Sequence, residues 1–342
     1  MHSTVFSPSM GGVETVGEIL ANQWTRMGME VRVSTDIIAS RDEFSFSVNR
    51  RPAVSTMWKL TRWADVIFHN QPSARAAWAP LMSRKPWFAT VHTWLPVYQR
   101  EEKLSLRRAL FNPCRFLAVS DAIARHLPNG QSQRVSNPYR SEIYVMNGTG
   151  NRDLDLLYVG RLVSDKGVTF LIEALAKLKT IGLCPKLEIV GDGPERNTLE
   201  SLCDEYRLRD QVVFKGALTA DHIASSMNRA RFTVIPSIWQ EPFGLVALEA
   251  LACGSVPVVS RVGGLPEAVG EHGVFFEGGD VDSLAATLKG LLANNSGYAP
   301  SAGEIQKHLR EHHPERVAAR YLEIFLSSTA QKHKRLQDKK KS

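Results

Sequence analysis

The chain has 342 residues, 43% of them hydrophobic, and a formal net charge of +7. A chain of this length and apolar content can build two ordinary domains, each with a substantial core. No apolar run approaches the ~20 residues of a membrane span and no signal-peptide pattern opens the chain, which argues against a transmembrane protein. We therefore expect a cytoplasmic protein, either soluble or peripheral at the inner face of the membrane.

Strand and helix signals alternate through the first half of the chain. Short runs of β-branched and aromatic residues predict strands at residues 4–6, 31–33, 66–68, 87–91 and 116–119. Between the first two strands, apolar residues at helical spacing predict a helix that stops at Gly28. The polar, glycine-bearing stretch 129–152 predicts an interdomain connection.

The second half repeats this alternation. Apolar runs predict strands at residues 154–159, 187–190, 212–214, 232–235, 256–259 and 274–276, and the last helix is amphipathic over 314–326. Two successive runs of alternating strands and helices are typical of a pair of doubly wound α/β domains.

Positive charge and tryptophan concentrate in the first half. Residues 1–150 hold 18 Lys and Arg against 11 Asp and Glu, whereas 151–331 have a net charge of −5 and the tail 332–342 holds six basic residues and one acid. Six of the seven tryptophans lie in the first hundred residues: Trp24, Trp58, Trp63, Trp78, Trp87 and Trp94. A basic, tryptophan-bearing surface suits an anionic bilayer or a phosphate-bearing acceptor. The alternative buries Trp58 and Trp63 in a core, and nucleic acid is disfavoured because no recognition motif is present.

The cysteines predict no cross-links. Cys114, Cys184, Cys203 and Cys253 stand far apart, with no Cys-x-x-Cys pair. We expect reduced, mostly buried thiols, and neither a disulfide framework nor a zinc site.

Two carboxylates, Glu241 and Glu249, flank a junction between a strand and a helix. The strand at 232–235 is followed by a turn and by the run 243–253, which predicts a helix opening at Phe243. Glu241 thus precedes a helix N-terminus, whose amides and positive dipole end suit a phosphate or a sugar hydroxyl. Glu249 lies ~10 Å further along the axis, in an apolar run where an unpaired carboxylate would be costly. The pair could hold two ends of an extended ligand; the alternative is a dipole-stabilised charge and a solvated face.

This Glu-x7-Glu pattern within Glu-Pro-Phe-Gly-Leu resembles the signature of the retaining GT-B glycosyltransferases of glycosyltransferase family four. Further motifs follow in that family's order: Gly11-Gly-Val-Glu14, Tyr158-Val-Gly-Arg161-Leu with Lys166-Gly, Ile189-Val-Gly-Asp-Gly-Pro194, Val213-Phe-Lys-Gly216 and Gly263-Gly-Leu-Pro-Glu267. Together they cover nearly the whole chain, which makes the set far more specific than any single motif.

The resemblance implies a GT-B fold of two Rossmann-like, doubly wound domains facing a cleft. Residues 1–148 would form the acceptor-side domain and 149–313 the nucleotide-sugar-binding domain. A helix at 314–330 would cross back to the first domain, and 331–342 would form a disordered basic tail.

The chemistry of a nucleotide sugar points to two cations. The leaving diphosphate develops negative charge that the enzyme must stabilise. Arg161 can bind two phosphate oxygens at once, and Lys166 is a compact point charge. In the resembling family the matching residues hold the diphosphate, whereas spacing alone leaves two surface charges at a strand end as the alternative.

The resemblance also assigns the remaining donor contacts. Glu241 matches the group that holds the donor hexose and distal phosphate, and Glu249 matches the carboxylate that binds the ribose hydroxyls. Backbone groups complete the expected donor set: Gly11, Gly12, Gly160, Val213, Phe214, Lys215, Gly216, Phe243, Gly244 and Leu245. Asp192 also falls within these motifs, and we expect it to cap the following helix rather than to perform chemistry.

Two motifs depart from the family pattern. Relatives often carry His-Asp after the strand at 87–91, whereas this chain reads His92-Thr93-Trp94. His92 remains a candidate catalytic residue, but no neighbouring carboxylate is available as an acceptor base. Few residues precede Gly11, so a short first strand could loosen the glycine loop.

Other classes of protein are less well supported. Asp153-Leu-Asp155 matches the Asp-x-Asp of metal-dependent GT-A enzymes, but Arg161 and Lys166 already offer the charge that a metal would supply, so we expect no metal and no other cofactor. A dinucleotide oxidoreductase is disfavoured because Gly-x-Gly-x-x-Gly is absent. A catalytically weakened nucleotide-sugar-binding protein stays open as the alternative.

The resemblance therefore implies a metal-independent retaining hexosyltransferase. It would move a hexose-type sugar from a nucleotide diphosphate sugar to a glycan or lipid-linked acceptor, in cell-surface polysaccharide or glycolipid synthesis. The mechanism that the resemblance implies is transfer in which the leaving diphosphate itself accepts the acceptor's proton. No side chain here is placed as a covalent nucleophile.

Overall fold

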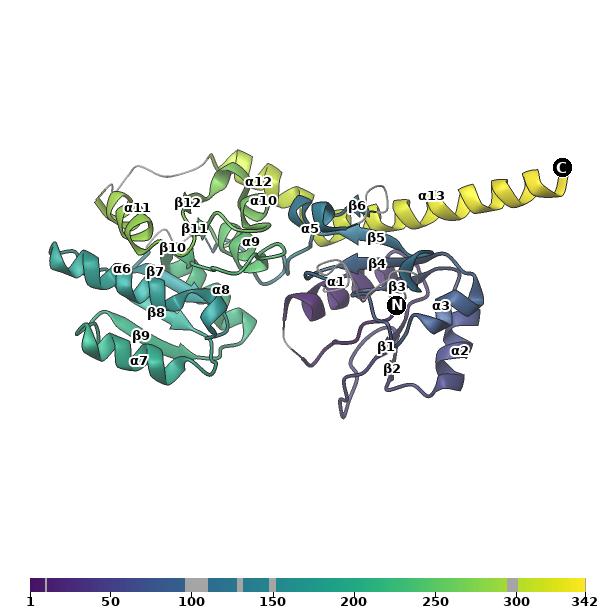
Figure 1. Cartoon of the computed structure of the whole chain (residues 1–342), viewed down its shortest axis with the longest axis horizontal. Helices are drawn as coiled ribbons and strands as arrows, with labels where there is room; N and C mark the ends of the chain where they lie inside the picture. The colour runs from purple at the N-terminus through teal and green to yellow at the C-terminus, as the bar shows by residue number, and fades with distance from the viewer. Residues whose placement is uncertain (10, 96–109, 128–131, 148–151, 294–300, 342) are drawn as a thin grey trace, which may run out of the picture. The chain divides into compact units, whose positions relative to one another are not determined.

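The computed structural model describes residues 1–9, 11–95, 110–127, 132–147, 152–293 and 301–341, with the backbone alone for 329–341. The chain forms two compact units, Met1–Tyr139 with Glu311–Ser342, and Arg140–Arg310 (Figure 1). The first boundary thus falls inside the polar stretch 129–152, nine residues before the expected one at 148, and the second precedes the expected one at 313 by three residues.

The second unit is a doubly wound α/β domain. Its elements are β7 (Leu154–Val159), η2 (Ser164–Lys166), α6 (Val168–Thr180), β8 (Leu187–Val190), α7 (Arg196–Glu205), β9 (Val212–Gly216), α8 (Ala220–Arg229), β10 (Ala230–Ile235), α9 (Leu245–Ala252), β11 (Val256–Ser260), α10 (Leu265–Val269), η3 (Gly270–His272), β12 (Val274–Phe276), α11 (Val281–Ala293) and α12 (Ala302–Glu311). The six strands are all parallel, in the order β12-β11-β10-β7-β8-β9.

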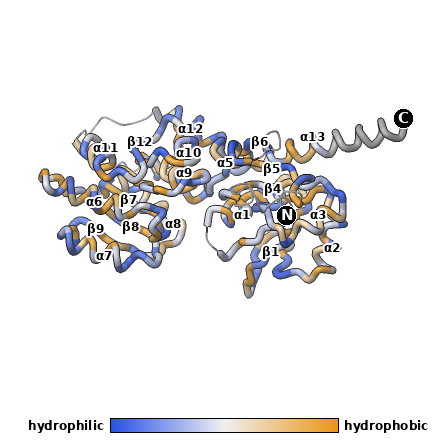
Figure 2. Tube along the Cα trace, viewed as in Figure 1, coloured by the Kyte–Doolittle hydropathy of each residue, from blue (hydrophilic) through white to orange (hydrophobic). Residues whose placement is uncertain are grey.

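Helices cover both faces of this sheet. The core on one face joins strand residues to Leu171 of α6, Leu199 of α7 and Leu284 of α11, all at most 1% exposed. Helices α8, α9 and α10 pack on β7, β10 and β11. Figure 2 shows hydrophobic and hydrophilic residues interleaved along the helices of both units, the pattern of helices that bury one side.

The first unit has a second parallel sheet. Its elements are α1 (Gly12–Arg26), β1 (Arg32–Thr35), β2 (Ser47–Arg50), α2 (Val54–Trp63), β3 (Ile67–His69), α3 (Trp78–Ser83), β4 (Trp87–Val91), β5 (Arg115–Ala118), α5 (Asp121–His126), β6 (Ser132–Arg134) and α13 (Pro314–Lys341). Strands β1 and β2 pair with each other, and β3 to β6 form a ladder in sequence order. The sequence did not predict β2 or β6, which are short and polar.

The predicted strand at residues 4–6 is absent. His2 instead makes one parallel bridge to Ser34 of β1 and one to His69 of β3. It therefore lies between β1 and β3, in the position of a central strand. The Ser3 hydroxyl donates to the Val5 carbonyl oxygen at 2.5 Å, a local bond that competes with ladder pairing. Phe6 turns into an aromatic core with its ring centroid 5.5 Å from that of Phe44.

Helix α13 packs on the first unit. The indole Nε1 of Trp24 donates to the Ala318 carbonyl oxygen at 3.1 Å, and the Tyr321 hydroxyl lies 3.0 Å from Thr90 Oγ1. The helix continues to Lys341, although the sequence was expected to form a disordered tail from 331. Residues 331–341 contain no glycine or proline and are rich in Lys and Gln, which are good helix formers.

The prediction of a tryptophan-bearing surface is wrong for part of the set. Trp24 and Trp87 are only 5% and 3% exposed, because both rings face the core of the first unit. Trp63 at the end of α2 is 36% exposed, while Trp58 is half-buried and stacks on Trp78 at 6.4 Å. None of the helices in the described ranges is both long enough and apolar enough to cross a membrane.

The prediction of mostly buried cysteines is confirmed. Cys114, Cys203 and Cys253 are buried and Cys184 is exposed.

Candidate functional site

The candidate donor site lies at the carboxyl edge of the second unit's sheet. Across the sheet the strands lie in the order β9-β8-β7-β10-β11-β12. Counted along the chain of this unit, this spatial order is 3-2-1-4-5-6. The connections therefore leave β7 and β10 on opposite sides, and ligands of such sheets bind in the crevice outside the strand ends at that switch point. The loop after β7 carries Arg161 and Lys166, and the loop after β10 carries Glu241.

Lys166 and Glu241 are in direct contact. Lys166 Nζ donates to Glu241 Oε1 at 2.5 Å, and the Ser237 hydroxyl donates to the same oxygen at 2.6 Å. The side chains of Lys166 and Glu241 are 23% and 12% exposed. The structure thus brings together two predicted site residues from the loops on either side of the switch point. Arg161 is exposed just after β7 and lies in the same loop as Lys166.

Two glycines allow the loop after β10 to lie close to the loops after β7 and β11. A Cβ on Gly167, whose φ is +69°, would lie 2.0 Å from the Pro236 carbonyl oxygen. A Cβ on Gly263, whose φ is +56°, would lie 2.1 Å from the Glu241 carbonyl oxygen. No other residue fits such close backbone contacts without displacing a loop.

Backbone hydrogen bonds hold the approach in place. The Asp165 carbonyl oxygen accepts from the amides of Ile238 and Trp239, both at 3.1 Å, and the Gly264 amide donates to the Glu241 carbonyl oxygen at 2.6 Å. The loops carrying Lys166 and Glu241 therefore form one rigid surface.

Helix α9 begins at Leu245, two residues later than predicted. Gly244 is its N-cap residue with φ +108° and ψ +64°, and no side chain caps the helix. The Ala247 amide donates to the Gly244 carbonyl oxygen at 3.1 Å, whereas the first two amides of α9 have no helical carbonyl before them, and the positive end of the helix dipole lies there. Phe243, Gly244 and Leu245 therefore present main chain at the N-terminus of α9, as the donor-site prediction requires.

Glu249 is buried in α9, 9% exposed. Burial raises the pKa of its carboxyl group to about 7, and the positive charge of Arg140 partly opposes that shift. A carboxylate kept in such a place without a ligand is unfavourable, which agrees with a role in binding hydroxyl groups.

The segment predicted for the nucleobase is the edge strand β9. Gly216 lies at the carboxyl end, where its carbonyl oxygen accepts from the Gly191 amide at 2.8 Å. Val213, Phe214 and Lys215 run back along the strand, and the Lys215 ammonium lies 3.7 Å from Glu188 Oε1. Of these four residues, Gly216 is the one placed at the edge where Arg161 lies.

The prediction that Asp192 caps the following helix is wrong. The N-cap residue of α7 is Glu195. Asp192 Oδ1 accepts from the next amide, Gly193, at 2.8 Å, and its carboxylate lies 3.9 Å from the Arg196 guanidinium. The turn at 194–195 places Asp192 too far from the helix to cap it.

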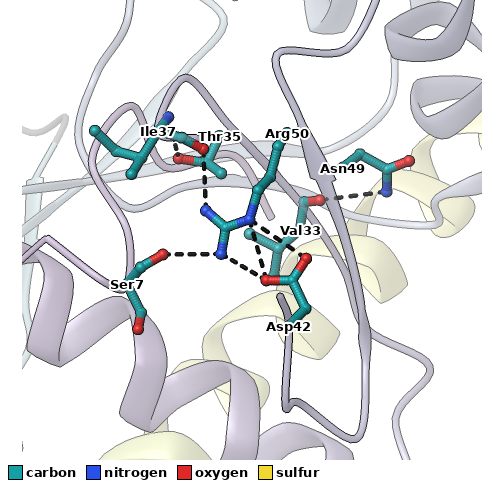
Figure 3. Close-up of polar contacts among 7 residues, drawn as sticks. All are labelled: Ser7, Val33, Thr35, Ile37, Asp42, Asn49 and Arg50. Carbon is teal, nitrogen blue, oxygen red and sulfur yellow. Dashed lines mark hydrogen bonds and ion pairs between the residues drawn. The ribbon is translucent and has the colours of Figure 1, made fainter. Parts of the chain in front are cut away.

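Gly11 and Gly12 lie in the first unit, at the start of α1. Gly11 is the N-cap residue with an extended φ of 171°, and the Ser9 hydroxyl donates to Glu14 Oε1 at 3.1 Å. The segment before this loop is tethered by Arg50, as Figure 3 shows. The Arg50 guanidinium donates to the carbonyl oxygens of Ser7 at 2.9 Å and Ile37 at 3.0 Å, and binds the Asp42 carboxylate at 2.5 Å. The segment that leads into the loop is therefore well supported, although the preceding strand is reduced to the two bridges of His2.

His92 follows β4 in the same unit and is 8% exposed. Its Nε2 lies 3.2 Å from Asn70 Oδ1, and Asn70 Nδ2 donates to the Val13 carbonyl oxygen at 2.7 Å. Because a carbonyl can only accept, Asn70 must present its oxygen to His92, so His92 carries its proton on Nε2 and leaves Nδ1 as an acceptor. Burial lowers the pKa of His92 to about 3, which keeps the ring neutral.

Three residues that support the candidates had no predicted role: Asn70, Ser237 and Tyr158. Asn70 orients His92, and Ser237 binds Glu241. Tyr158 Oη donates to the Arg161 carbonyl oxygen. Each lies at or just beyond the end of a strand, and that position was the available signal.

The Asp153-Leu-Asp155 motif is engaged by arginines. Asp153 lies 2.9 Å from Arg229 and Asp155 lies 3.1 Å from Arg231. Among the described residues, no group of three or more His, Cys, Asp or Glu side chains is arranged to hold a metal ion.

Comparison with known proteins places this geometry in a family. The glycosyl transferases group 1 family model matches residues 142–312, half of the chain. A glycosyltransferase of Methanocaldococcus jannaschii, MJ1607, is 42% identical over 141 residues, which cover 41% of this chain and 36% of that protein. The GDP-mannose-dependent alpha-(1-6)-phosphatidylinositol monomannoside mannosyltransferase of Mycolicibacterium smegmatis is 32% identical over 184 residues, covering 51% of this chain and 48% of that protein. The matches thus span about a third to a half of these relatives.

The fold is shared over nearly the whole chain. The crystal structure of HepE from Anabaena in complex with UDP superposes with a TM-score of 0.79 at 21% identity, covering 95% of this chain and 98% of HepE. This likeness confirms the predicted GT-B fold of two Rossmann-like domains. The chain belongs to the glycosyl transferases group 1 family.

Proposed function

We propose that this protein transfers a hexose-type sugar from a nucleoside diphosphate sugar to a glycan or lipid-linked acceptor, with retention of anomeric configuration. The process would be the synthesis of a cell-surface polysaccharide or glycolipid. The observation that carries the proposal is the placement of Arg161, Lys166 and Glu241 at the switch point of the second unit's sheet. UDP bound to HepE and the GDP-mannose and phosphatidylinositol monomannoside in the name of the mycobacterial relative support the donor and acceptor classes.

The cations would act on the leaving group. Negative charge grows on the diphosphate as the bond to the sugar breaks, and preorganised donors stabilise that charge without reorganising. Arg161 offers an exposed guanidinium, Lys166 an ammonium held against Glu241, and the N-terminus of α9 a set of main-chain amides. With this charge available from the protein, the reaction needs no metal, and the arginines that bind Asp153 and Asp155 occupy the motif that a metal would use.

Retention follows if the acceptor attacks on the face that the diphosphate leaves. The diphosphate itself would then accept the acceptor's proton, and Glu241 would hold the sugar. His92, neutral and with Nδ1 as an acceptor, stays the proposed catalytic residue of the first unit. Glu249 would bind the ribose hydroxyls.

Nucleotide release tests the proposal directly. We would incubate the protein with UDP-glucose, UDP-galactose, UDP-N-acetylglucosamine and GDP-mannose, in EDTA and in magnesium, and measure free UDP or GDP. We expect one donor to be hydrolysed slowly in EDTA. The alternative is a catalytically weakened nucleotide-sugar-binding protein. It would be supported by a donor that raises the Tm of the protein but releases no nucleotide, with or without membrane lipid extract as acceptor.

The pKa of Glu249 predicts how binding depends on pH. Only the ionised carboxylate accepts hydrogen bonds from both ribose hydroxyls, and a pKa of about 7 leaves it mostly ionised at pH 8 and mostly protonated at pH 6. We expect the Kd for UDP or GDP, measured by calorimetry, to weaken about tenfold from pH 8 to pH 6.

Glu249→Gln serves as the matched control. The variant has no carboxyl group to titrate at residue 249, whereas the diphosphate of UDP or GDP titrates in both experiments. We expect this variant to bind more weakly at pH 8 and to lose the extra pH dependence. A folded-state pKa raised above the unfolded value costs stability as pH rises through it, so Glu249→Gln should also raise the Tm at pH 8. Identical pH profiles for the two proteins would remove Glu249 from the nucleotide site.

We also propose that an anionic membrane surface presents the acceptor. On α2, Val54 is 71% and Trp63 36% exposed, Lys59 and Arg62 are exposed, and the Arg32 guanidinium lies 3.9 Å above the Trp63 ring. Apolar and basic side chains on one surface helix suit shallow contact with anionic lipid. Of the other basic residues in the first half of the chain, Arg50 pairs with Asp42 and its side chain is 12% exposed, and Lys103, Arg107 and Arg108 lie outside the described residues.

Vesicle sedimentation checks this prediction. Each basic residue near an anionic surface is worth ~1 kcal/mol, so we expect binding to vesicles containing phosphatidylglycerol and release as salt rises from about 0.05 to 0.5 M. Lys59→Glu/Arg62→Glu should abolish binding, whereas the charge-matched control Lys177→Glu/Arg209→Glu in the second unit should not. Equal recovery with neutral vesicles would point to a soluble acceptor.

A further inference from the structure

Tyr158 lies beneath the loop that carries Arg161. It is the penultimate residue of β7, is 2% exposed and packs in the core of the second unit. Its hydroxyl donates to the Arg161 carbonyl oxygen at 2.9 Å. A buried tyrosine hydroxyl needs a partner, and here that partner is the main chain of the residue proposed to stabilise the leaving group.

The rest of the loop is tied to the neighbouring strand. The Gly160 amide donates to the Val190 carbonyl oxygen at 3.0 Å, and the Leu162 amide donates to the Asp192 carbonyl oxygen at 2.9 Å. Both residues flanking Arg161 are thus held by main chain at the end of β8. The Arg161 carbonyl is held by a side chain, and that side chain is Tyr158.

The loop folds tightly over the phenol. A Cβ on Gly160 would lie 2.8 Å from the Tyr158 hydroxyl oxygen, closer than real Cβ contacts. The hydroxyl therefore supports the loop from below while the Arg161 side chain is exposed above it. A small change at the hydroxyl is transmitted to the Cα of Arg161, because the bond is to its own carbonyl.

The phenol acts as a hydrogen-bond donor and not as an acid or base. Burial, followed by the negative charges of Glu241 and Asp165, raises the pKa of Tyr158 well above its ordinary value. The hydroxyl therefore keeps its proton at any pH at which the protein would work.

We propose that Tyr158 is a positioning residue for the proposed transfer reaction and that it acts through Arg161. Its hydroxyl sets where the Arg161 guanidinium lies against the diphosphate. The inference rests on the proposed function. It predicts that removing the hydroxyl lowers kcat by more than any loss of folded protein explains.

Tyr158→Phe tests the inference because it removes the hydroxyl and keeps the ring in the core. With the donor selected by the nucleotide-release panel, we expect kcat to fall about tenfold, as losing one hydrogen bond's worth of positioning would, with KM for the donor unchanged. In an Arg161→Ala background the same substitution should have no further effect on kcat. A double-mutant cycle of this kind isolates coupling between two residues.

Tyr321→Phe is the matched control. It deletes another buried tyrosine hydroxyl, 3.0 Å from Thr90 Oγ1 in the first unit, and should lower the Tm without changing kcat. Rates are compared below the Tm of every variant, so that loss of folded protein does not enter.

The outcomes distinguish this inference from the proposed function. If Arg161→Ala lowers kcat but Tyr158→Phe does not, or lowers it equally in both backgrounds, Tyr158 does not act through Arg161. If Arg161→Ala leaves kcat unchanged, the donor-site assignment itself fails and the inference fails with it.

Discussion

Arg161→Ala is expected to lower kcat about a hundredfold while weakening the binding of the intact nucleotide sugar much less. The guanidinium is exposed at the end of β7, at the sheet's switch point, so it is free to meet the diphosphate. The negative charge on the diphosphate, which the guanidinium would stabilise, grows as the sugar departs. Losing one such stabilising group commonly costs ~3 kcal/mol of transition-state stabilisation. Steady-state kinetics with the selected donor would give kcat, and calorimetry with the same intact nucleotide sugar would give its Kd, so the two effects are measured separately.

A surface arginine supplies the control. Arg209 is 56% exposed and pairs with Asp204 after α7, away from the carboxyl edge of the sheet. Arg209→Ala should leave both constants unchanged. If Arg161→Ala raised the Kd and spared kcat, the arginine would contribute to ground-state binding alone.

Lys166→Ala is expected to lower kcat at least as far and also to destabilise the second unit. Lys166 Nζ lies 2.5 Å from Glu241 Oε1, and the two side chains are 23% and 12% exposed. Removing the ammonium leaves a mostly buried carboxylate beside the place where the diphosphate would bind. Breaking such a pair from one side costs ~3 kcal/mol of unfolding free energy, measurable by urea denaturation.

The double variant Lys166→Met/Glu241→Gln distinguishes the two effects. With no uncompensated charge left, its unfolding free energy should recover towards that of the wild type, whereas its activity should stay lost. Lys177→Ala is the control, since Lys177 and Asp282 form an exposed pair whose loss should change neither quantity. Recovery of activity in the double variant would show that the pair serves folding alone.

The strands of the second unit could be predicted closely because each is marked by a short apolar run in the local sequence. Residues 154–159 and 187–190 form β7 and β8 with the expected bounds, since each is a mostly apolar run, interrupted by one acidic residue, of the kind that a parallel sheet buries on both faces. Strand β2 could not be found in this way, because Ser47–Arg50 is polar and pairs only through the backbone of β1.

The start of the chain was misjudged for a related reason. Thr4-Val5-Phe6 has strand composition, but Phe6 is drawn into a cluster with Phe44 and Phe46, residues some forty positions away. Composition favours a strand there, and packing with distant residues prevents it. Trp24 shows the same limit, since its burial depends on α13 at the other end of the chain.

The sequence by itself determined the order of strands and helices and the motifs that mark strand ends, because periodicity and turn residues act over a few positions. It also named Arg161, Lys166, Glu241 and Glu249 as candidates. Only the tertiary structure decided that Lys166 pairs with Glu241, 75 positions away, and that Asn70 orients His92. It also decided that burial brings the pKa of Glu249 to about 7. Pairing and desolvation depend on atoms that distant segments bring together, and no local pattern carries that information.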